Sequence, residues 1–264
     1  MEWYFLNIAI TVGVFLVLIL AAALWEKRPV KCYGPAQSNI PGDFVSYLSR
    51  VDAEAGTLGL VDRSVHKHVK YDIFVLVWFS PQRDIIIESG QGRIAKMPTA
   101  QTWLYSRLDN GRFLITSDGF GDEDLSGLSK TRYVWKGSLS QLLKKHRAML
   151  EASDVAMQPF TEETAADALE AMRREQTDRL VQLRLVRWLD DKQSQWRYTV
   201  IGGLRTTVGT LKQLGVALSQ IWRGKTCYGP TADEVQSPLA KQQAGWFAGP
   251  LLSPNGLILM KSWQ

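Results

Sequence analysis

The sequence YDIFVLVWF at residues 71–79 is the segment that decides the fold class. It is rich in β-branched and aromatic residues and stops at Ser80-Pro81, which is typical of a buried strand. A second apolar run follows at 84–88 and is ended by the glycine-rich segment 89–92. We therefore predict that a β-sheet forms the centre of this part of the chain.

Further strand signals continue as far as residue 135. Segments 101–107 and 112–117 are joined by a turn containing Asn110-Gly111, a strong hairpin signal, and 131–135 has the pattern of a last strand. Residues 138–152 then predict a helix with Ser138 as its N-cap and one apolar stripe, formed by Leu139, Leu142, Leu143, His146 and Leu150. The sequence thus predicts an α+β protein whose mostly antiparallel β module, over 36–155, is closed by a helix.

Residues 3–25 form one apolar run of about 23 residues with no charge, enough for a helix to cross a hydrocarbon core of about 30 Å. We predict an N-terminal single-pass transmembrane anchor here, with Trp3 and Trp25 at the headgroup levels. Lys27 and Arg28 follow the run, so the body is expected in the cytoplasm of a bacterial cell, at the inner membrane. A cleaved signal peptide is the alternative, but its basic start is missing.

Composition narrows the classes of partner. The net charge of +5 and the pI of 9.2 are mildly basic, a level that suits an anionic membrane surface or a nucleic acid and requires neither. The basic cluster at 144–147 is more typical of a solvated helix face than of a nucleic-acid contact, so nucleic acid is expected to be an unlikely partner. The chain has two cysteines, too few for a disulfide framework.

Residues 161–192 predict a long helix, with acids in the first turns, bases later and an apolar stripe. One helix of a bundle or hairpin is the plain interpretation. A self-associating coiled coil, which would make the protein a homo-oligomer, is the sharper one, although sustained heptads are missing. With the segment that follows, this gives a helical pair over 161–224.

The segment from 193 to 232 contains no Asp or Glu, and its apolar residues recur at helical spacing. A basic amphipathic helix flanked by Trp lies along an anionic bilayer surface, although a core helix beside acidic partners has the same pattern. The candidate membrane-surface residues are Trp196, Arg197, Arg205, Lys212, Trp222, Arg223 and Lys225. A C-terminal β-hairpin is predicted over 245–264, turned by Pro254-Asn255-Gly256.

Both cysteines lie in the same tetrapeptide, Cys-Tyr-Gly-Pro, at 32–35 and 227–230, and each copy follows an apolar helix that ends in Trp. Chance can explain four residues. If the echo is real, each copy ends a helix, since Gly permits the chain to turn and Pro prevents the helix from resuming. Cys32 and Cys227 could form a disulfide only in an oxidising compartment.

Candidate catalytic chemistry is weak throughout the chain. His66 and His68 share one face if their segment is extended, and His146 is the third histidine, but a metal site needs more ligands than these. The acidic loop 118–124 lacks the spacing of a calcium loop, and the glycine-rich segment 89–93 lacks the helix and lysine of a phosphate loop. No cofactor is predicted, and the residues favour a protein that is not an enzyme.

These observations lead to one main hypothesis and two alternatives. The main one is a membrane-anchored binding or scaffold protein that contacts the lipid bilayer and another protein. The first alternative is a membrane-tethered hydrolase acting on lipid or phosphate groups. The second is an oligomeric subunit of a membrane complex.

Overall fold

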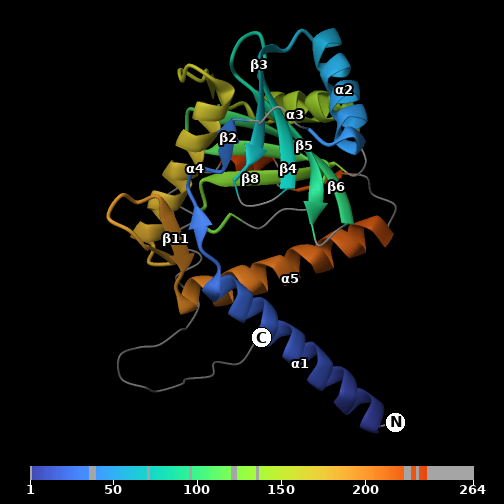
Figure 1. Ribbon diagram of the computed structural model, residues 1–264, viewed down its shortest axis with the longest axis vertical. Helices are drawn as coiled ribbons and strands as arrows, with labels where there is room; N and C mark the ends of the chain where they lie inside the picture. The colour runs from blue at the N-terminus through green and yellow to red at the C-terminus, as the bar shows by residue number, and fades with distance from the viewer. Residues whose placement is uncertain are drawn as a thin grey trace.

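The computed structural model describes residues 2–35, 40–69, 72–94, 97–119, 124–134, 137–222, 227–229 and 232–236. Their fold is α+β, as predicted. A large mixed sheet lies between helix α4 on one face and helices α2 and α3 on the other, while α1 and α5 meet at one end of this body (Figure 1).

The large sheet has the spatial order β12-β8-β7-β6-β5-β4-β3-β2, and β9 pairs with β6 beside this path. Its neighbouring strands are antiparallel except β7 and β8, which are parallel. The strands are β2 (Tyr33–Pro35), β3 (Val61–His68), β4 (Asp72–Phe79), β5 (Ile86–Ile94), β6 (Met97–Leu108), β7 (Phe113–Ser117), β8 (Ser129–Val134), β9 (Met157–Gln158) and β12 (Cys227–Tyr228). The predicted strands and the turn at Asn110-Gly111 are therefore confirmed.

Strand β4 is buried on both faces, which explains its unbroken apolar sequence. Val75, Val77 and Phe79 pack towards α4, in the same cluster as Leu169 and Met172. The alternate side chains Phe74, Leu76 and Trp78 pack with residues of α2 and α3. One strand thus contributes to two cores.

Strand β5 continues through the glycine-rich segment that was predicted to end it. Gly90 and Gly92 lie opposite Val75 and Ile73 of β4. A Cβ atom at Gly90 would be 2.7 Å from the Val75 side chain, and one at Gly92 would be 2.5 Å from that of Ile73. Glycine is required here for close strand packing, so the prediction that 89–92 ends the strand was wrong.

The helices of the described residues are α1 (Glu2–Trp25), α2 (Gly42–Thr57), α3 (Leu139–Ser153), α4 (Ala165–Gln182), α5 (Val200–Trp222) and α6 (Ala232–Gln236). Helix α3 confirms its prediction: Ser138 caps it in a reciprocal arrangement with Gln141, and all five predicted stripe residues are buried. Helix α2 was not predicted, although Phe44, Leu48, Val51 and Ala55 have the helical spacing of a buried face.

The predicted helix over 161–192 is shorter than expected. Helix α4 ends at Gln182, and Arg184 takes a left-handed backbone conformation with φ of 57°. The chain then forms a hairpin of β10 (Val186–Trp188) and β11 (Gln195–Tyr198), to which β1 (Arg28–Pro29) adds a third strand. The hairpin forms because Val186 and Tyr198 are buried against the end of α4, a long-range contact that outweighs local helix preference.

The predicted helical pair is also corrected, because α5 packs against α1 rather than α4. The contact is close where Gly203 faces Leu20 and Leu24. A helix over residues 3–25 is thus confirmed as α1. Within the described ranges, no helix is both long enough and apolar enough to cross a membrane. The predicted transmembrane placement of α1 therefore has no support from the structure.

The two Cys-Tyr-Gly-Pro segments occupy opposite edges of the large sheet. Tyr33–Pro35 forms β2 at one edge, and Cys227–Tyr228 forms β12 at the other. Cys32 and Cys227 are therefore kept apart by the width of the sheet. The predicted C-terminal hairpin at 245–264 lies outside the described residues.

Candidate functional site

The outer face of α5 is apolar. Five of its side chains are exposed to between 39% and 64%, and they are Val200, Ile201, Leu204, Val208 and Leu211. They follow one another at helical spacing and form a single stripe. Trp222, at the end of the helix, is 91% exposed. A helix on the surface of a protein in water normally presents polar residues outwards, so this pattern is inverted.

The inner face of α5 explains how an inverted helix can pack on the body. It consists of small or hydroxyl-bearing residues, namely Gly202, Gly203, Thr206, Thr207 and Gly209, all of them buried. A Cβ atom at Gly202 would lie 1.8 Å from the carbonyl oxygen of Leu185. Thr199 is the N-cap of the helix, because its hydroxyl accepts a hydrogen bond from the Gly202 N–H at 3.2 Å. The glycine spacing thus serves close packing.

Helix α1 continues the exposed apolar surface. Six of its large apolar side chains are between 54% and 79% exposed, and they are Trp3, Ile10, Val14, Val17, Leu18 and Trp25. Asn7 is a polar residue that is also exposed on this helix. Together with the outer stripe of α5, the six apolar side chains form what we call the apolar helix surface. Helix α1 leads away from the body and α5 runs beneath it (Figure 1).

The predicted membrane-surface residues are divided between two elements. Trp196 and Arg197 lie on strand β11, so the helix begins at Val200 rather than at Trp196. Arg205 and Lys212 lie on α5, half-buried and exposed respectively, and each has an interaction partner. Arg223 and Lys225 lie outside the described residues.

The small sheet places aromatic rings at the base of the two helices. The guanidinium of Arg28 lies 5.5 Å from the Trp196 ring centroid and 5.0 Å from that of Tyr198. Arg28 also pairs with Glu26 at 3.0 Å. One of the two predicted basic flanking residues therefore stabilises the fold, whereas Lys27 remains exposed.

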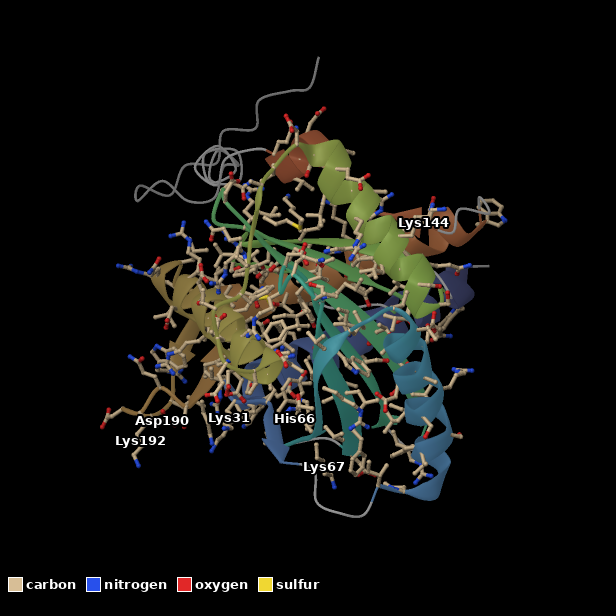
Figure 2. All side chains as sticks on the ribbon, turned by 90° about the horizontal axis from the view of Figure 1, so that it is seen from above. Lys31, His66, Lys67, Lys144, Asp190 and Lys192 are labelled. Carbon is tan, nitrogen blue, oxygen red and sulfur yellow. The ribbon has the colours of Figure 1, made fainter. Side chains whose placement is uncertain are left out.

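The three histidines do not meet. His66 and His68 lie on the α4 side of β3, with their rings 5.9 Å and 6.2 Å from that of Tyr33. His146 lies on α3, across the sheet; Figure 2 shows His66 on one side of the body and Lys144 of the same α3 helix on the other. Among the residues that the structure describes, no three His, Cys, Asp or Glu side chains could hold a metal ion. The structure therefore does not bring the weak metal candidates together.

His146 forms a buried pair with a serine that resembles a nucleophile and its base. Its Nε2 is 2.9 Å from Ser106 Oγ, and its Nδ1 is 2.8 Å from Thr116 Oγ1. The Ser106 hydroxyl donates to the Asp84 carbonyl oxygen at 2.9 Å, and in that arrangement Nε2 carries the ring proton and donates to Ser106. Burial lowers the pKa of His146 to about 3, aided by the positive charges of Arg147 and Arg132. His146 is therefore a neutral structural link between α3 and the sheet.

A second buried polar cluster joins the other face of the sheet to α4, and the sequence did not predict it. The Tyr33 hydroxyl donates to one carboxylate oxygen of Glu88, and the Tyr105 hydroxyl donates to the other at 2.8 Å. Arg173 lies 3.3 Å from that second oxygen and donates to the Tyr33 oxygen at 2.6 Å. Burial raises the pKa values of both tyrosines well above their ordinary value. The Arg173 Nη1 atom is buried without a partner, but the other contacts join β2 and α4 to β5.

The cysteine and the acidic loop are also held by the fold. Burial raises the pKa of the Cys32 thiol, which makes it a poor nucleophile. Asp118 accepts a hydrogen bond from the Thr102 N–H at 2.7 Å, and burial raises its pKa to about 6. Asp124 accepts bonds from Ser126 and Ser129, which close a turn. Residues 120–123 of the predicted loop lie outside the described residues.

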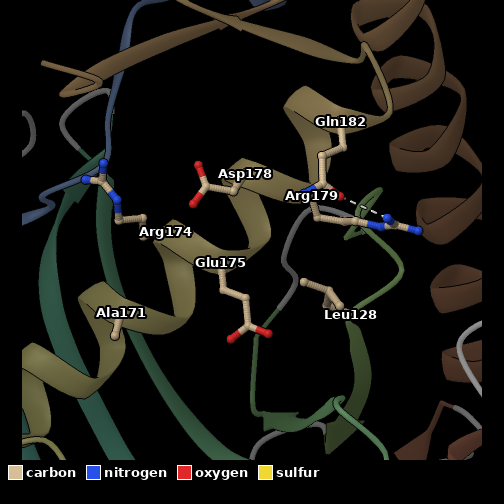
Figure 3. Close-up of a pocket in the computed structure, with 7 residues that line it drawn as sticks. All are labelled: Leu128, Ala171, Arg174, Glu175, Asp178, Arg179 and Gln182. Carbon is tan, nitrogen blue, oxygen red and sulfur yellow. Dashed lines mark hydrogen bonds between the residues drawn. The ribbon is translucent and has the colours of Figure 1, made fainter. Parts of the chain in front are cut away.

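An open pocket of about 460 Å³ lies on the outer side of α4 (Figure 3). Arg174, Glu175, Asp178 and Arg179 line it, and Arg179 donates to Gln182 at 3.0 Å. Charges of both signs alternate along this helix face. Such a lining is typical of a solvated surface and gives no preference for one ligand.

Comparison with known proteins does not relate the chain to a known family. The chain matches no protein-family model, no curated protein and no solved structure.

Proposed function

We propose that this protein is a membrane-attached binding or scaffold protein, held at the bilayer by the apolar helix surface. The observation that carries the proposal is the inverted burial of α5, with Gly and Thr inside and Val, Ile and Leu outside. A large apolar side chain gains about 1.5–3 kcal/mol when it is fully removed from water. An exposed stripe of this kind therefore favours contact with lipid, where no such cost arises.

Helix α1 supports the same proposal from the sequence. Its run of apolar residues from 3 to 25 contains no charged side chain, and Trp3 and Trp25 stand at its ends. We propose that α1 inserts into the bilayer while α5 lies along its surface. Lys27 and Lys31 follow α1, which favours a cytoplasmic body at a bacterial inner membrane.

A binding role fits the interior of the body better than hydrolysis does. The histidines that a metal hydrolase would use lie on opposite faces of the sheet. Ser106 and His146 are both fully buried, and the Ser106 hydroxyl also contacts the Asp84 carbonyl oxygen, so this pair is closed to a substrate. These observations support a body that presents a surface to a partner protein.

The test is a depth measurement on the full chain in neutral lipid vesicles. In a background with Cys32→Ser and Cys227→Ser, a spin label is placed at Leu204 on α5, at Val14 on α1, or at Val45 on α2 as the matched control. Val45 is 45% exposed and Leu204 is 47% exposed, so both positions admit a label in the isolated protein. We expect oxygen, which concentrates in lipid, to relax the labels at 204 and 14 but not the label at 45.

Each result has a clear meaning. If the labels at 204 and 14 are as accessible to a water-soluble relaxing agent as the label at 45, the proposal is wrong. If only the label at 14 is in lipid, attachment is by α1 alone and the role proposed for α5 fails.

A further inference from the structure

Three cations lie in a row across the small sheet. Arg187 of β10 is directly opposite Arg197 of β11. Arg28 is opposite Trp196 in an antiparallel pair. Lys27 precedes β1, and extending that register by one residue sets Lys27 against Arg197. Side chains alternate along a strand, so Arg187, Arg197 and Lys27 share one face while the aromatic residues occupy the other. We call these three residues the cation row.

The cation row has no counter-charge in the part of the chain that the structure describes. None of the three side chains makes an ion pair or a hydrogen bond there, and the Nε of Arg197 is buried without a partner. The nearest acids along the hairpin lie in its turn, where Asp190 is already occupied by Ser194 at 2.7 Å. Like charges directly opposite one another on neighbouring strands destabilise a sheet. A bound anion would offset this repulsion.

The position of the cation row indicates which class of anion would bind to it. Lys27 follows the last residue of α1 by two positions, and α5 begins two positions after Tyr198. The small sheet therefore lies where both helices of the apolar helix surface join the body (Figure 1). If those helices contact the bilayer, the row lies at the level of the lipid headgroups. Arg suits phosphate because its planar fork can donate two parallel hydrogen bonds.

We propose that Lys27, Arg187 and Arg197 bind the phosphate group of an anionic phospholipid. The inference rests on the proposed membrane attachment, and it adds to it a headgroup preference. Juxtamembrane cations contribute about fivefold each to binding of anionic lipid.

The test uses the full chain in neutral detergent micelles, so that it does not depend on attachment to vesicles. Short-chain phosphatidylglycerol is titrated and the thermal midpoint is followed, with short-chain phosphatidylcholine and inorganic phosphate as comparison probes. The variant is Arg187→Gln with Arg197→Gln. The matched control is Lys144→Gln with Lys145→Gln, which removes two exposed cations from α3.

We expect phosphatidylglycerol to bind the unmodified chain in preference to both other probes. The arginine variant should bind it about 25-fold more weakly, and the α3 control should change by less than twofold. Without lipid, the arginine variant should be at least as stable as the unmodified chain, because the opposed charges are gone. If the two arginines had a purely structural role, the variant would be less stable than the unmodified chain.

Two results would overturn the inference. One is equal affinity of the arginine variant and the unmodified chain for phosphatidylglycerol. The other is equal binding of inorganic phosphate, which would make this a site for free phosphate. If the double variant does not fold, Arg187→Glu replaces the repulsion with a cross-strand ion pair to Arg197, and should keep the fold while abolishing lipid binding. Failure of the vesicle test with success of this titration would disprove attachment but leave the cation row as a site for the headgroup of an anionic lipid.

Discussion

The sheet body and the α1–α5 pair use the same apolar residues in opposite ways. In β4, every residue from Phe74 to Phe79 is buried, between α4 and the layer of α2 and α3. In α5, glycine and threonine are buried while valine, isoleucine and leucine face outwards. The body therefore has the pattern of a protein folded in water. The helix pair has the reverse pattern, which is the observation behind the proposed contact with lipid.

The comparison shows why apolar periodicity alone does not locate a core. Helix α5 has a clear apolar stripe, and in a soluble protein that stripe would face inwards. Here the small residues decide the packing face, because only they allow the backbone to approach Leu185 and Leu24. The expectations below are ordered by the size of their effect, all for the full chain in neutral detergent micelles.

The sharpest test replaces one tryptophan in each region. Trp78 is 2% exposed within the body, and Trp222 is 91% exposed at the end of α5. Trp78→Ala should lower the free energy of unfolding by about 3–5 kcal/mol, because it leaves a large cavity. Trp222→Ala should change it by less than about 0.5 kcal/mol. Chemical denaturation measures both, and a comparable loss in the two variants would contradict the difference between the regions.

Two glycines of α5 test which face of the helix is packed. Gly202→Ala should cost about 3 kcal/mol, because its Cβ would meet the Leu185 carbonyl. Gly215→Ala, where no atom lies within 4 Å, should raise stability by about 0.5–1 kcal/mol through helix propensity. The measurement is again the free energy of unfolding. Equal effects at both positions would mean that α5 does not pack through its glycine face.

Two groups of the body, His146 and Asp118, should make the stability of the fold depend on pH in opposite directions. The pKa of His146 is about 3 in the fold against 6.5 ordinarily, so its contribution is complete above pH 6.5 and is lost as the pH falls towards 3. The pKa of Asp118 is about 6 against 3.8, so its contribution is present at low pH and is lost as the pH rises through 6. Between pH 4 and pH 6, the changes of the free energy of unfolding with pH that these two groups cause cancel one another.

Asp118→Asn removes the contribution of Asp118, so that the pH dependence caused by His146 is no longer cancelled. From pH 6 to pH 4, this variant should lose about 2 kcal/mol more stability than the unmodified chain, because the full slope of about 1.36 kcal/mol for each pH unit applies only well between the two pKa values. Denaturation curves at a series of pH values provide the measurement. Parallel pH profiles for the two proteins would show that the Asp118 carboxyl is not held in its neutral form.

The junction between the two regions is tested by Glu88. The chain leaves α1, passes through the small sheet and enters β2, whose Tyr33 is fixed by Glu88 and Arg173. Glu88→Gln should cost about 2 kcal/mol, because it leaves the Arg173 charge without its partner in a partly buried site. An unchanged unfolding midpoint in Glu88→Gln would show that this cluster does not hold β2.

Much of the body could be predicted from local pattern. The strand at 71–79, the Asn110-Gly111 turn and the stripe of α3 each carry their signal within a few residues. The extension of β5 could not be predicted, because its glycines are explained only by Val75 and Ile73 of another strand. The hairpin of β10 and β11 depends likewise on burial against α4 and α1.

The candidate site was predicted in part. Trp3, Trp25, Trp222 and Lys212 are exposed as a surface role requires, whereas Trp196 and Arg197 were assigned to the wrong element. The cation row was missed because Arg187 stood inside a predicted helix, where it would not oppose Arg197. The Glu88 cluster joins residues 33, 88, 105 and 173, which no local pattern connects. Helix α2 had a local signal that was overlooked.

The two Cys-Tyr-Gly-Pro segments set the order in which the sheet can be completed. Each follows an apolar helix and supplies one edge strand, β2 after α1 and β12 after α5. During synthesis, the β3 edge can be covered as soon as β3 emerges, since β2 precedes it in the chain. The outer edge of β8, in contrast, waits for 93 further residues, from 135 to 227, before β12 arrives. Until then that edge can pair with another nascent chain. Because α5 precedes β12, the sheet can be completed at this edge only after α5 has been synthesised.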